Sequence, residues 1–520
     1  MEVEDVERCC CVVTLNEAFS APSPVSFSAV VIHPTTGVVI STGLPFFRFI
    51  IDKKSSYASE RRFLLRHNFR DDLKIGISFP SRSHVEASAC GVSEVGPPST
   101  RHRTHEQGAE LLMLVNCVEF KNTFQTLFHK ADQWRFHGDD DDDLFRDADC
   151  LSWFAILKAD KPHPGTVSWR RSTCLQKGSP VMACGSPFGS LCSDLFNGTV
   201  SKGIISNLAG EDNAIIFTDA RCLPGAEGGG LYTMENDNLH LVGVIVSPFG
   251  WKANEWIGLT LVCSVHSILR NIVQCGDIQD LLHDVWLHPA EVFTTRKANA
   301  GPYPNVCFVD SGQHWGSGVL VTPELILTCR HVVNGKSTVA LKFHHRARVL
   351  DTFGDVLFST KASSPYDVAV VRSRESIFDV VIPQMAHEFN TGESVLVVGY
   401  GGLGRWCGPS LTCGVLSKAI SHHNRTIMLQ TTCAVQAGTS GGAVIRASTG
   451  ELLGIVSSNT RDLASKVTYP HLNFCIPVSM LHRPLLHLSR LGDMRMFDML
   501  DVAEEQVKRV WRLQGTPSKL

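Results

Sequence analysis

The chain contains one glycine-rich turn twice, and this repeat limits its fold more than any other feature of its 520 residues. The first copy reads PGAEGGGLY at 224–232 and the second reads AGTSGGAVI at 437–445, so both share the frame Gly-x-x-Gly-Gly. Four further pairs of similar segments accompany the turns: GSPVMACGSPFG (178–189) with GESVLVVGYGGLG (392–404), VSKGIIS (200–206) with LSKAIS (416–421), LHLVGVIVS (239–247) with ELLGIVSS (451–458), and SAVVIHPTTGVVIST (28–42) with SGVLVTPELILTC (317–329). Repetition of this extent predicts a duplicated fold.

The length also requires more than one domain. We expect a first copy over 1–290, a second copy over 291–495 and a C-terminal region over 496–520. This last region contains DVAEEQVKRVWRL, a pattern typical of a short amphipathic helix, and then Gly515 and Pro517, which stop a helix. We therefore expect a short C-terminal helix and a tail.

Short apolar runs rich in β-branched residues dominate the second copy. They are GSGVLV, LILT, DVAVV, SVLVVG, TIMLQT, GAVI and LLGIVS, and residues typical of turns separate them. Helical periodicity is scarce before about residue 496. This pattern predicts an all-β sandwich or barrel of antiparallel strands.

Three polar residues stand where strands of the second copy begin or end. His331 follows LILTCR, Asp367 opens DVAVV, and Ser440 lies in the glycine-rich turn. A serine hydroxyl is a weak nucleophile at neutral pH and needs an adjacent base. An imidazole can take its proton while a carboxylate fixes the imidazole tautomer. The sequence thus predicts Ser440 as nucleophile, His331 as base and Asp367 as its partner, with the amides of Gly438 and Ser440 as the oxyanion hole.

With these pieces in place, residues of about 300–480 resemble trypsin-like serine proteases, most closely the HtrA/Deg-like branch. The resemblance rests on GSGVLVTPELILTCRHV, YDVAVVR and GTSGGAV. Together with the repeated segments, it implies a duplicated trypsin-like double β-barrel. Val332 stands where secreted members carry a disulfide cysteine, and Thr439 stands where zymogens carry an activating Asp. We therefore expect a protease that needs neither a disulfide nor zymogen-type activation.

The first copy lacks all three candidate catalytic residues. Aligning the repeats places about Leu44 opposite His331, Trp153 opposite Asp367, and Glu227 opposite Ser440. We interpret the first copy as a degenerate protease with a structural role: a docking platform, an inhibitor or a dimer surface. Compared with the second copy, it carries an insertion over roughly 50–140.

The resemblance also places a specificity pocket before the nucleophile. In trypsin-like folds its floor lies six residues before the serine, which is Ala434 here. The following wall strand GIVSSN would supply Val456, Ser457 and Ser458. Because none of these residues is acidic, we expect a small or modest neutral side chain before the cleaved bond.

The chain ends in Ser518-Lys519-Leu520, the tripeptide read by a soluble peroxisomal import receptor. A degenerate first copy, an intact second copy and this terminus together are similar to peroxisomal processing proteases. The resemblance implies a peroxisomal matrix location, removal of leader peptides from imported matrix proteins, and processing of some enzymes of fatty-acid β-oxidation. It also implies self-cleavage, and self-association is a further expectation.

We predict that self-cleavage occurs at the bond Cys90–Gly91. The surrounding stretch SHVEASACGVSEVGPPS is rich in small residues and lies within the predicted insertion. Such a segment can adopt the extended conformation that a protease cleft binds, and Cys90 suits a small neutral pocket.

Composition argues against several other classes of function. Hydrophobic residues make up 43% and charged residues 19% of the chain, and the net charge is −3. This balance favours neither nucleic acid nor an anionic membrane as a partner. We expect no cofactor and no metal, because CxxC and HExxH motifs are absent and the HH pairs at 344–345 and 422–423 do not suit ligation from one helix face. Without a secretory leader, the 18 cysteines are expected to be free thiols.

Two functions other than proteolysis remain open. The chain could be a catalytically silent scaffold that retained the fold, as the first copy is expected to be. It could also act as a chaperone-like holdase, in which case Ser440→Ala would retain the main activity.

Overall fold

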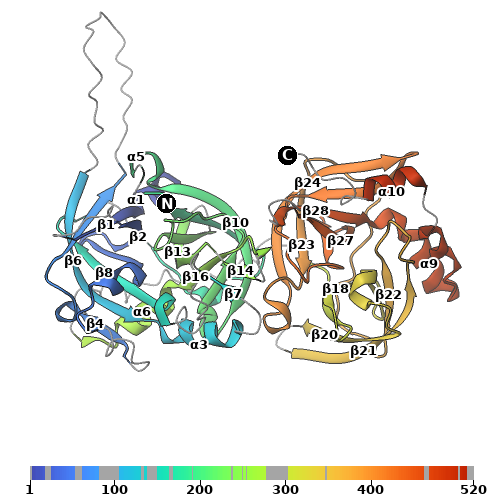
Figure 1. Cartoon of the computed structure of the whole chain (residues 1–520), viewed down its shortest axis with the longest axis horizontal. Helices are drawn as coiled ribbons and strands as arrows, with labels where there is room; N and C mark the ends of the chain where they lie inside the picture. Colours follow the sequence, from blue (N-terminus) through green and yellow to red (C-terminus); the bar gives the residue numbers. More distant parts are fainter. Residues whose placement is uncertain are drawn as a thin grey trace, which may run out of the picture.

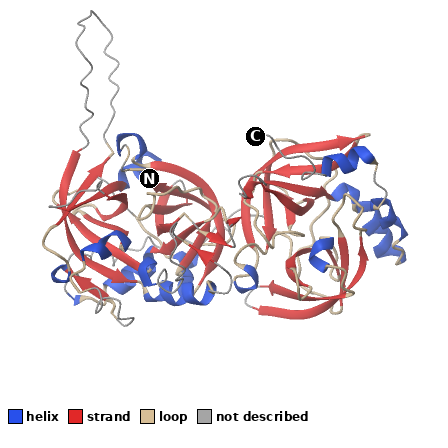
Figure 2. Ribbon diagram, viewed as in Figure 1, coloured by secondary structure: helices blue, strands red, loops and turns tan. Residues whose placement is uncertain are grey.

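The structure is a computed structural model that describes 3–17, 25–52, 61–80, 105–129, 134–136, 149–162, 168–189, 191, 193–235, 238–248, 250–252, 255–276, 303–345, 348–461, 468–501 and 504–511. Four six-stranded antiparallel barrels fill these ranges, two in each half of the chain (Figure 1). Strands make up most of both halves, and the helices between them are short (Figure 2). The expected all-β, duplicated trypsin-like double barrel is confirmed.

The first half builds its two barrels in chain order. The strands of its first barrel, in their order around the barrel, are β6 (His105–Asn116), β5 (Leu73–Phe79), β1 (Cys10–Glu17), β2 (Val25–His33), β3 (Val38–Thr42) and β8 (Trp153–Ala159), with β4 (Phe63–Leu65) added beside β6. Those of its second barrel are β10 (Thr199–Ala209), β11 (Ile215–Thr218), β16 (Thr260–Ser264), β13 (Asn238–Ser247), β12 (Gly230–Glu235) and β9 (Pro180–Gly185). A small separate sheet contains β15 (Glu255–Trp256), β14 (Trp251–Lys252) and β7 (Trp134–Arg135).

The second half repeats this arrangement. Its first barrel contains β17 (Val306–Asp310), β18 (Trp315–Leu320), β19 (Leu325–Thr328), β22 (Ala369–Ser373), β21 (Arg348–Ser359) and β20 (Thr338–His345). Its second barrel contains β23 (Ser394–Gly399), β24 (Ser410–His422), β25 (Arg425–Thr431), β28 (Thr468–Pro477), β27 (Leu452–Arg461) and β26 (Ala443–Arg446).

Helices connect and flank the barrels. The α-helices are α1 (Val3–Cys9), α3 (Val118–Leu127), α5 (Ser193–Phe196), α6 (Val265–Ile272), α8 (Arg330–Val333), α9 (His482–Leu491) and α10 (Glu505–Trp511). The 3-10 helices are η1 (Leu44–Phe49), η2 (Arg66–Asn68), η4 (Ser172–Cys174), η5 (Glu211–Asn213), η7 (Gly404–Trp406), η8 (Val478–Met480) and η9 (Arg495–Leu500). The helix expected in 496–520 is α10, but helical structure already begins at α9.

The apolar runs in the sequence reflect strands that are buried on both faces. In β22 and the residue before it, Ala369 and Val371 pack inside the first barrel of the second half, whereas Val368 and Val370 belong to the core between the two barrels. Successive side chains of a strand point to opposite faces, so both faces of such a strand must be apolar. The strand that Asp367 precedes therefore contributes to the core between the two barrels.

The predicted insertion at about 50–140 needs correction. It contains β5 and β6, which pair with each other and close the first barrel against β1 and β8. They occupy the places that β20 and β21 take in the second half. Within the described residues, the second half has no counterpart of β4, α3 or β7. The segment 81–104 and the acidic run 139–143 lie outside the described residues.

Candidate active site

His331 lies in α8, directly after β19. The neighbouring Val332 and Val333 are fully buried in the core of the first barrel and anchor this single helical turn. The His331 side chain is 50% exposed, so it can meet a substrate. The turn ends at Asn334, whose φ of +48° is in the left-handed region.

His331 and Asp367 contact each other twice. The His331 amide donates a hydrogen bond of 3.0 Å to Asp367 Oδ1, and His331 Nδ1 hydrogen-bonds to Asp367 Oδ2. Burial alone would raise the pKa of the Asp367 carboxyl, but the hydrogen bonds and charge of His331, together with Arg330, lower it overall. The carboxylate therefore stays charged and fixes the ring, leaving His331 Nε2 as the nitrogen that can accept a proton.

Arg330 supports the Asp367 loop, although its role was not predicted from the sequence. Its Nη1 donates to the carbonyl oxygens of Lys361 at 2.6 Å and Tyr366 at 3.3 Å. Its Nε lies 3.8 Å from Asp367 Oδ1. A basic residue beside the candidate histidine in CRHVV is the only signal for this contact in the sequence.

The turn that carries Ser440 is fixed by backbone and serine contacts. Gly438 and Gly441 have φ values of +93° and +83°, a conformation that favours glycine. The Ser440 carbonyl accepts from the Ser317 amide at 2.8 Å, and Ser317 Oγ donates to the Gly438 carbonyl at 2.8 Å. Ser317 is fully buried and was not singled out from the sequence, where it is one polar residue in GSGVLV.

The amides of Gly438 and Ser440 are available to a ligand. Within the described residues, neither amide donates a hydrogen bond to another group of the protein. Ser440 Oγ donates to the Ser457 carbonyl at 3.3 Å. The structure thus brings the two predicted oxyanion donors and the candidate nucleophile onto one turn.

Of the four predicted pocket residues, Ala434 precedes this turn in the chain, and Val456, Ser457 and Ser458 follow it. Ala434, Val456 and Ser457 are buried and Ser458 is partly exposed. The Val456 side chain packs in the core of the second barrel, and its carbonyl accepts from the Gly441 amide at 2.8 Å. Ala434 is held by its carbonyl, which accepts from Thr412 Oγ1 at 2.9 Å.

The first half reproduces this framework without the catalytic side chains. Ser28 takes the place of Ser317: its amide donates to the Glu227 carbonyl at 3.0 Å, and its Oγ donates to the Gly225 carbonyl at 2.7 Å. Glu227 therefore occupies the position of Ser440.

Strand register gives the other two correspondences. Ser41 pairs with Ala155 in the first half, as Thr328 pairs with Ala369 in the second. Ser41 Oγ donates to the Ser28 carbonyl, as Thr328 Oγ1 donates to the Ser317 carbonyl. Three residues after Ser41 is Leu44, in the place of His331. Two residues before Ala155 is Trp153, in the place of Asp367.

One group of potential metal ligands coincides with the candidate site. Sulfur, nitrogen and oxygen atoms of Cys329, His331 and Asp367 lie within 4.8 Å of one another. However, Cys329 is fully buried, and its Sγ donates to the Val456 carbonyl at 3.2 Å. Burial and the nearby Asp367 charge raise the pKa of this thiol well above its usual value. Cys329 is therefore a neutral thiol, whereas a metal would require a thiolate.

A second group of potential ligands lies at the surface. His422, the last residue of β24, and His423, in the turn that follows it, face Glu504 just before α10. His422 Nε2 is 2.6 Å from a Glu504 carboxylate oxygen. We expected that this HH pair would not suit ligation from one helix face, and the two histidines lie instead at the end of β24 and in the turn after it.

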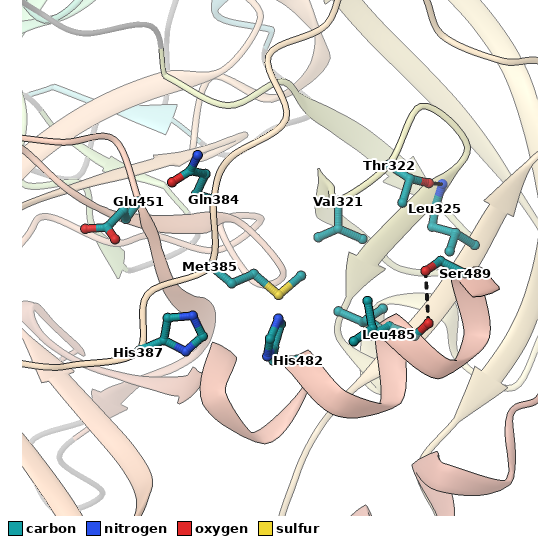
Figure 3. Close-up of a pocket in the computed structure, with 11 residues that line it drawn as sticks. Val321, Thr322, Leu325, Gln384, Met385, His387, Glu451, His482, Leu485 and Ser489 are labelled. Carbon is teal, nitrogen blue, oxygen red and sulfur yellow. Dashed lines mark hydrogen bonds between the residues drawn. The ribbon is translucent and has the colours of Figure 1, made fainter. Parts of the chain in front are cut away.

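A cavity of about 400 Å³ lies away from the candidate catalytic residues, beside α9 (Figure 3). Val321 and Leu325 form one side, Met385 lies at its centre, and the rings of His387 and His482 approach edge to face with centroids 5.3 Å apart. None of the predicted site residues lines it. The candidate site is thus identified by its side-chain geometry rather than by this cavity.

Two sets of predicted residues lie outside the described residues. They are the predicted self-cleavage bond, Cys90–Gly91, and the targeting tripeptide, Ser518, Lys519 and Leu520. The 16 cysteines within the described ranges are free thiols. No helix in these ranges is both long and apolar enough to cross a membrane.

Comparisons with known proteins show which proteins this chain is similar to. Residues 316–455 match the family described as trypsin-like peptidase domain. The chain is 36% identical to the peroxisomal leader peptide-processing protease of Homo sapiens, over 98% of this chain and 96% of that protein. It is 35% identical to the protein of the same name from Mus musculus, over 99% and 97%. A solved serine endoprotease from Yersinia pestis is 23% identical with a TM-score of 0.30, covering 39% of this chain and 69% of that structure.

Proposed function

Because the chain belongs to the family of peroxisomal leader peptide-processing proteases, we propose that it is a serine endopeptidase of the peroxisomal matrix. Its substrates are imported matrix proteins from which it removes leader peptides, and they include some enzymes of β-oxidation. It also cleaves itself. The paired contact between His331 and Asp367 is the observation that carries the catalytic part of this proposal, and the two available amides of the Ser440 turn support it.

The proposed reaction begins at Ser440. Its Oγ turns from the Ser457 carbonyl toward His331 Nε2, which removes the hydroxyl proton as Oγ attacks the carbonyl carbon of the substrate. The negative charge that forms on the carbonyl oxygen accepts hydrogen bonds from the Gly438 and Ser440 amides. Asp367 stabilises the resulting imidazolium.

The second half of the cycle uses the same groups. Protonated His331 gives its proton to the leaving amine, and an acyl-enzyme on Ser440 remains. His331 then activates a water molecule that hydrolyses the acyl-enzyme, again through an oxyanion held by the two amides. The neutral walls at Ala434, Ser457 and Ser458 support a preference for a small or modest neutral residue before the cleaved bond.

Labelling with a fluorophosphonate probe tests the catalytic part. We expect the wild-type protein to be labelled at Ser440 and the Ser440→Ala protein to remain unlabelled. Labelling that persists in Ser440→Ala would contradict the assignment of the nucleophile.

The substrates require a separate experiment. Peroxisomal matrix proteins are incubated with wild-type or Ser440→Ala protein, and the new N-termini are identified by mass spectrometry. The proposal expects termini near the starts of imported proteins in the wild-type sample alone. If both samples give the same termini, the chain acts as a scaffold or holdase and not as a processing protease.

A further inference from the structure

The degenerate first half contacts the second half close to the candidate oxyanion hole. β10 lies beside β24, and the small sheet of β7 and β14 faces the second half (Figure 1). These elements come from parts of the chain more than 150 residues before the turn they approach. The first half is therefore placed to affect the site it cannot itself form.

Polar groups at the interface, Asp219 buried and Lys177 partly buried, fix the two halves against each other. Asp219 of the first half accepts from the Ile204 amide at 2.7 Å and from the Cys413 amide of the second half at 2.6 Å. Lys177 donates to the carbonyls of Cys407 at 3.0 Å and Pro409 at 2.7 Å, and burial lowers its pKa to about 8. A charged group that is removed from water must keep its partners, so these contacts define one relative position.

The same interface holds the loop that follows β23. Leu403 of this loop is buried in the core of the first half, together with Trp134 and Ile257. Lys252 Nζ donates to the Gly402 carbonyl at 2.8 Å. A side chain at Gly402 would lie 3.0 Å from Ile257 Cδ1, which shows how closely the two halves approach.

One side chain joins this loop, the first half and the oxyanion turn. Gln436 is 6% exposed. Its Nε2 donates to the Ile257 carbonyl at 2.6 Å, and its Oε1 accepts from the Gly402 amide at 2.8 Å. Its backbone carbonyl accepts from the Thr439 amide at 3.0 Å, which closes the turn that contains Gly438.

We propose that Gln436 is a positioning residue through which the first half orients the oxyanion turn of the protease half. This inference rests on the proposed function, because it gives the Gly438 and Ser440 amides their role. The Ile257 carbonyl holds the amide group of Gln436, and Gln436 holds the start of the turn. The degenerate half thus completes the active site.

The corresponding turn of the first half shows that the backbone does not need this side chain. Leu223 stands in the place of Gln436, and its carbonyl accepts from the Ala226 amide at 3.0 Å. The Leu223 side chain is 44% exposed. The turn therefore forms with either residue, and Gln436 adds the connection between the halves. Removing that connection is expected to leave the fold intact and to change the orientation of the turn.

Gln436→Met in the full-length chain tests this role, since it keeps the side-chain length and removes both hydrogen bonds. Hydrolysis of N-acetyl-alanine p-nitrophenyl ester is the assay. We expect kcat to fall about tenfold to a hundredfold, because a displaced oxyanion donor weakens transition-state binding. KM is expected to change less than about twofold, because the ground state binds these amides weakly.

Asn207→Ala is the matched control. Asn207 Nδ2 crosses the same interface to the Gly408 carbonyl at 3.3 Å and Ser410 Oγ at 3.0 Å, away from the oxyanion turn. Both variants are expected to lower the unfolding temperature, but Asn207→Ala is expected to keep kcat within about twofold of wild type. A Gln436→Met protein with unchanged kcat, or equal losses of kcat in both variants, would overturn the proposal.

Gln436→Glu gives a second readout, the pH dependence of kcat relative to wild type, which a purely structural role of Gln436 would not affect. Its carboxylate would face the Ile257 carbonyl without a proton to donate, whereas the protonated carboxyl can donate. We expect the ratio of kcat for Gln436→Glu to kcat for wild type to rise as the pH falls. A constant ratio would contradict a hydrogen bond to Ile257 that acts on catalysis.

Ser440→Ala separates this inference from the proposed function. If Ser440→Ala abolishes ester hydrolysis and Gln436→Met has no effect, only the positioning role is overturned. If Ser440→Ala hydrolyses the ester as fast as wild type, both proposals are overturned.

Discussion

Glu227 Oε2 accepts a hydrogen bond of 2.6 Å from the Gly225 amide, the group that corresponds to the Gly438 amide of the second half. The first half thus keeps the turn of an oxyanion hole and fills it with its own carboxylate. Burial raises the pKa of Glu227, and hydrogen bonds from the amides of Glu227 and Gly225 offset only part of that increase. The anion site of the first-half turn is therefore already occupied by a side chain of the protein.

Replacing Glu227 with Gln should remove a loss of folding stability that grows as the pH rises. A raised carboxyl pKa means that the folded state binds more protons than the unfolded state, so stability falls as pH rises from the usual value of about 4.5 through the folded-state pKa. A tenfold difference in proton affinity between the two states corresponds to about 1.4 kcal/mol of stability. We expect the free energy of unfolding of Glu227→Gln, relative to wild type, to increase over this pH range in urea titrations.

The same variant should leave proteolysis almost unchanged, because the Glu227 carboxyl belongs to the first half. A difference in stability that is constant with pH would contradict the assigned ionisation. Loss of cleavage in Glu227→Gln would show that the first-half turn takes part in catalysis.

The three candidate catalytic residues should act as one unit. We expect Ser440→Ala, His331→Ala and Asp367→Asn each to lower kcat by about 10³-fold or more, and the double variants to lose little beyond the single ones. Steady-state hydrolysis of a peptide substrate measures these losses. Independent, multiplicative losses would indicate that the residues serve separate functions.

Much of the fold and of the candidate site could be predicted from local patterns. The Gly-x-x-Gly-Gly frame and the strand runs predicted the duplicated double barrel, and the alignment placed Trp153 and Glu227 where the strand register and hydrogen bonds place them. Local patterns could not show β5 and β6 as barrel strands, because the chain between them is long and polar.

Contacts between distant segments were also beyond sequence reasoning. Gln436 and Ile257 are 179 residues apart, and neither stands in a motif. Their hydrogen bond depends on how the two halves pack, which hydrophobic periodicity does not specify. Ser317 was missed for a related reason: a buried serine in an apolar strand resembles a tolerated polar residue until its partners Gly438 and Tyr400 are known.

Import should depend on the last residue of the chain. Removing Leu520, or extending the C-terminus with a tag, should leave the protein in the cytosol, because the import receptor reads a free terminal tripeptide. An N-terminal tag should have no such effect. Fluorescence microscopy in cells without the endogenous protein tests this. A C-terminally extended protein that still enters peroxisomes would contradict a role for Ser518-Lys519-Leu520.

Self-cleavage should occur between Cys90 and Gly91. The expected fragments are residues 1–90 and 91–520, and the larger one retains the candidate triad. N-terminal sequencing of the large fragment identifies the bond, with Ser440→Ala expressed alone as control. A new terminus outside 76–110 would refute the predicted position. Cleavage that persists in the control would show that another protease is responsible.

The equivalent serines Ser317 and Ser28 allow the strictest test of whether only the second half takes part in catalysis. Ser317 Oγ accepts from the Tyr400 amide at 2.8 Å and donates to the Gly438 carbonyl, and Ser28 Oγ accepts from the Ser186 amide at 2.7 Å in the same way. Both serines are fully buried. Replacing either with Ala leaves a buried amide and a buried carbonyl without this partner, at a cost of about 1–3 kcal/mol for each unsatisfied group.

We therefore expect Ser317→Ala and Ser28→Ala to lower the free energy of unfolding by similar amounts in urea titrations. Only Ser317→Ala should also lower kcat, by about tenfold or more, because Ser317 holds the peptide group that follows the oxyanion donor Gly438. Equal losses of kcat in the two variants would mean that activity follows overall stability. A loss confined to Ser317→Ala would mean that the two halves, built on one framework, differ in catalysis because only one turn is left open to substrate.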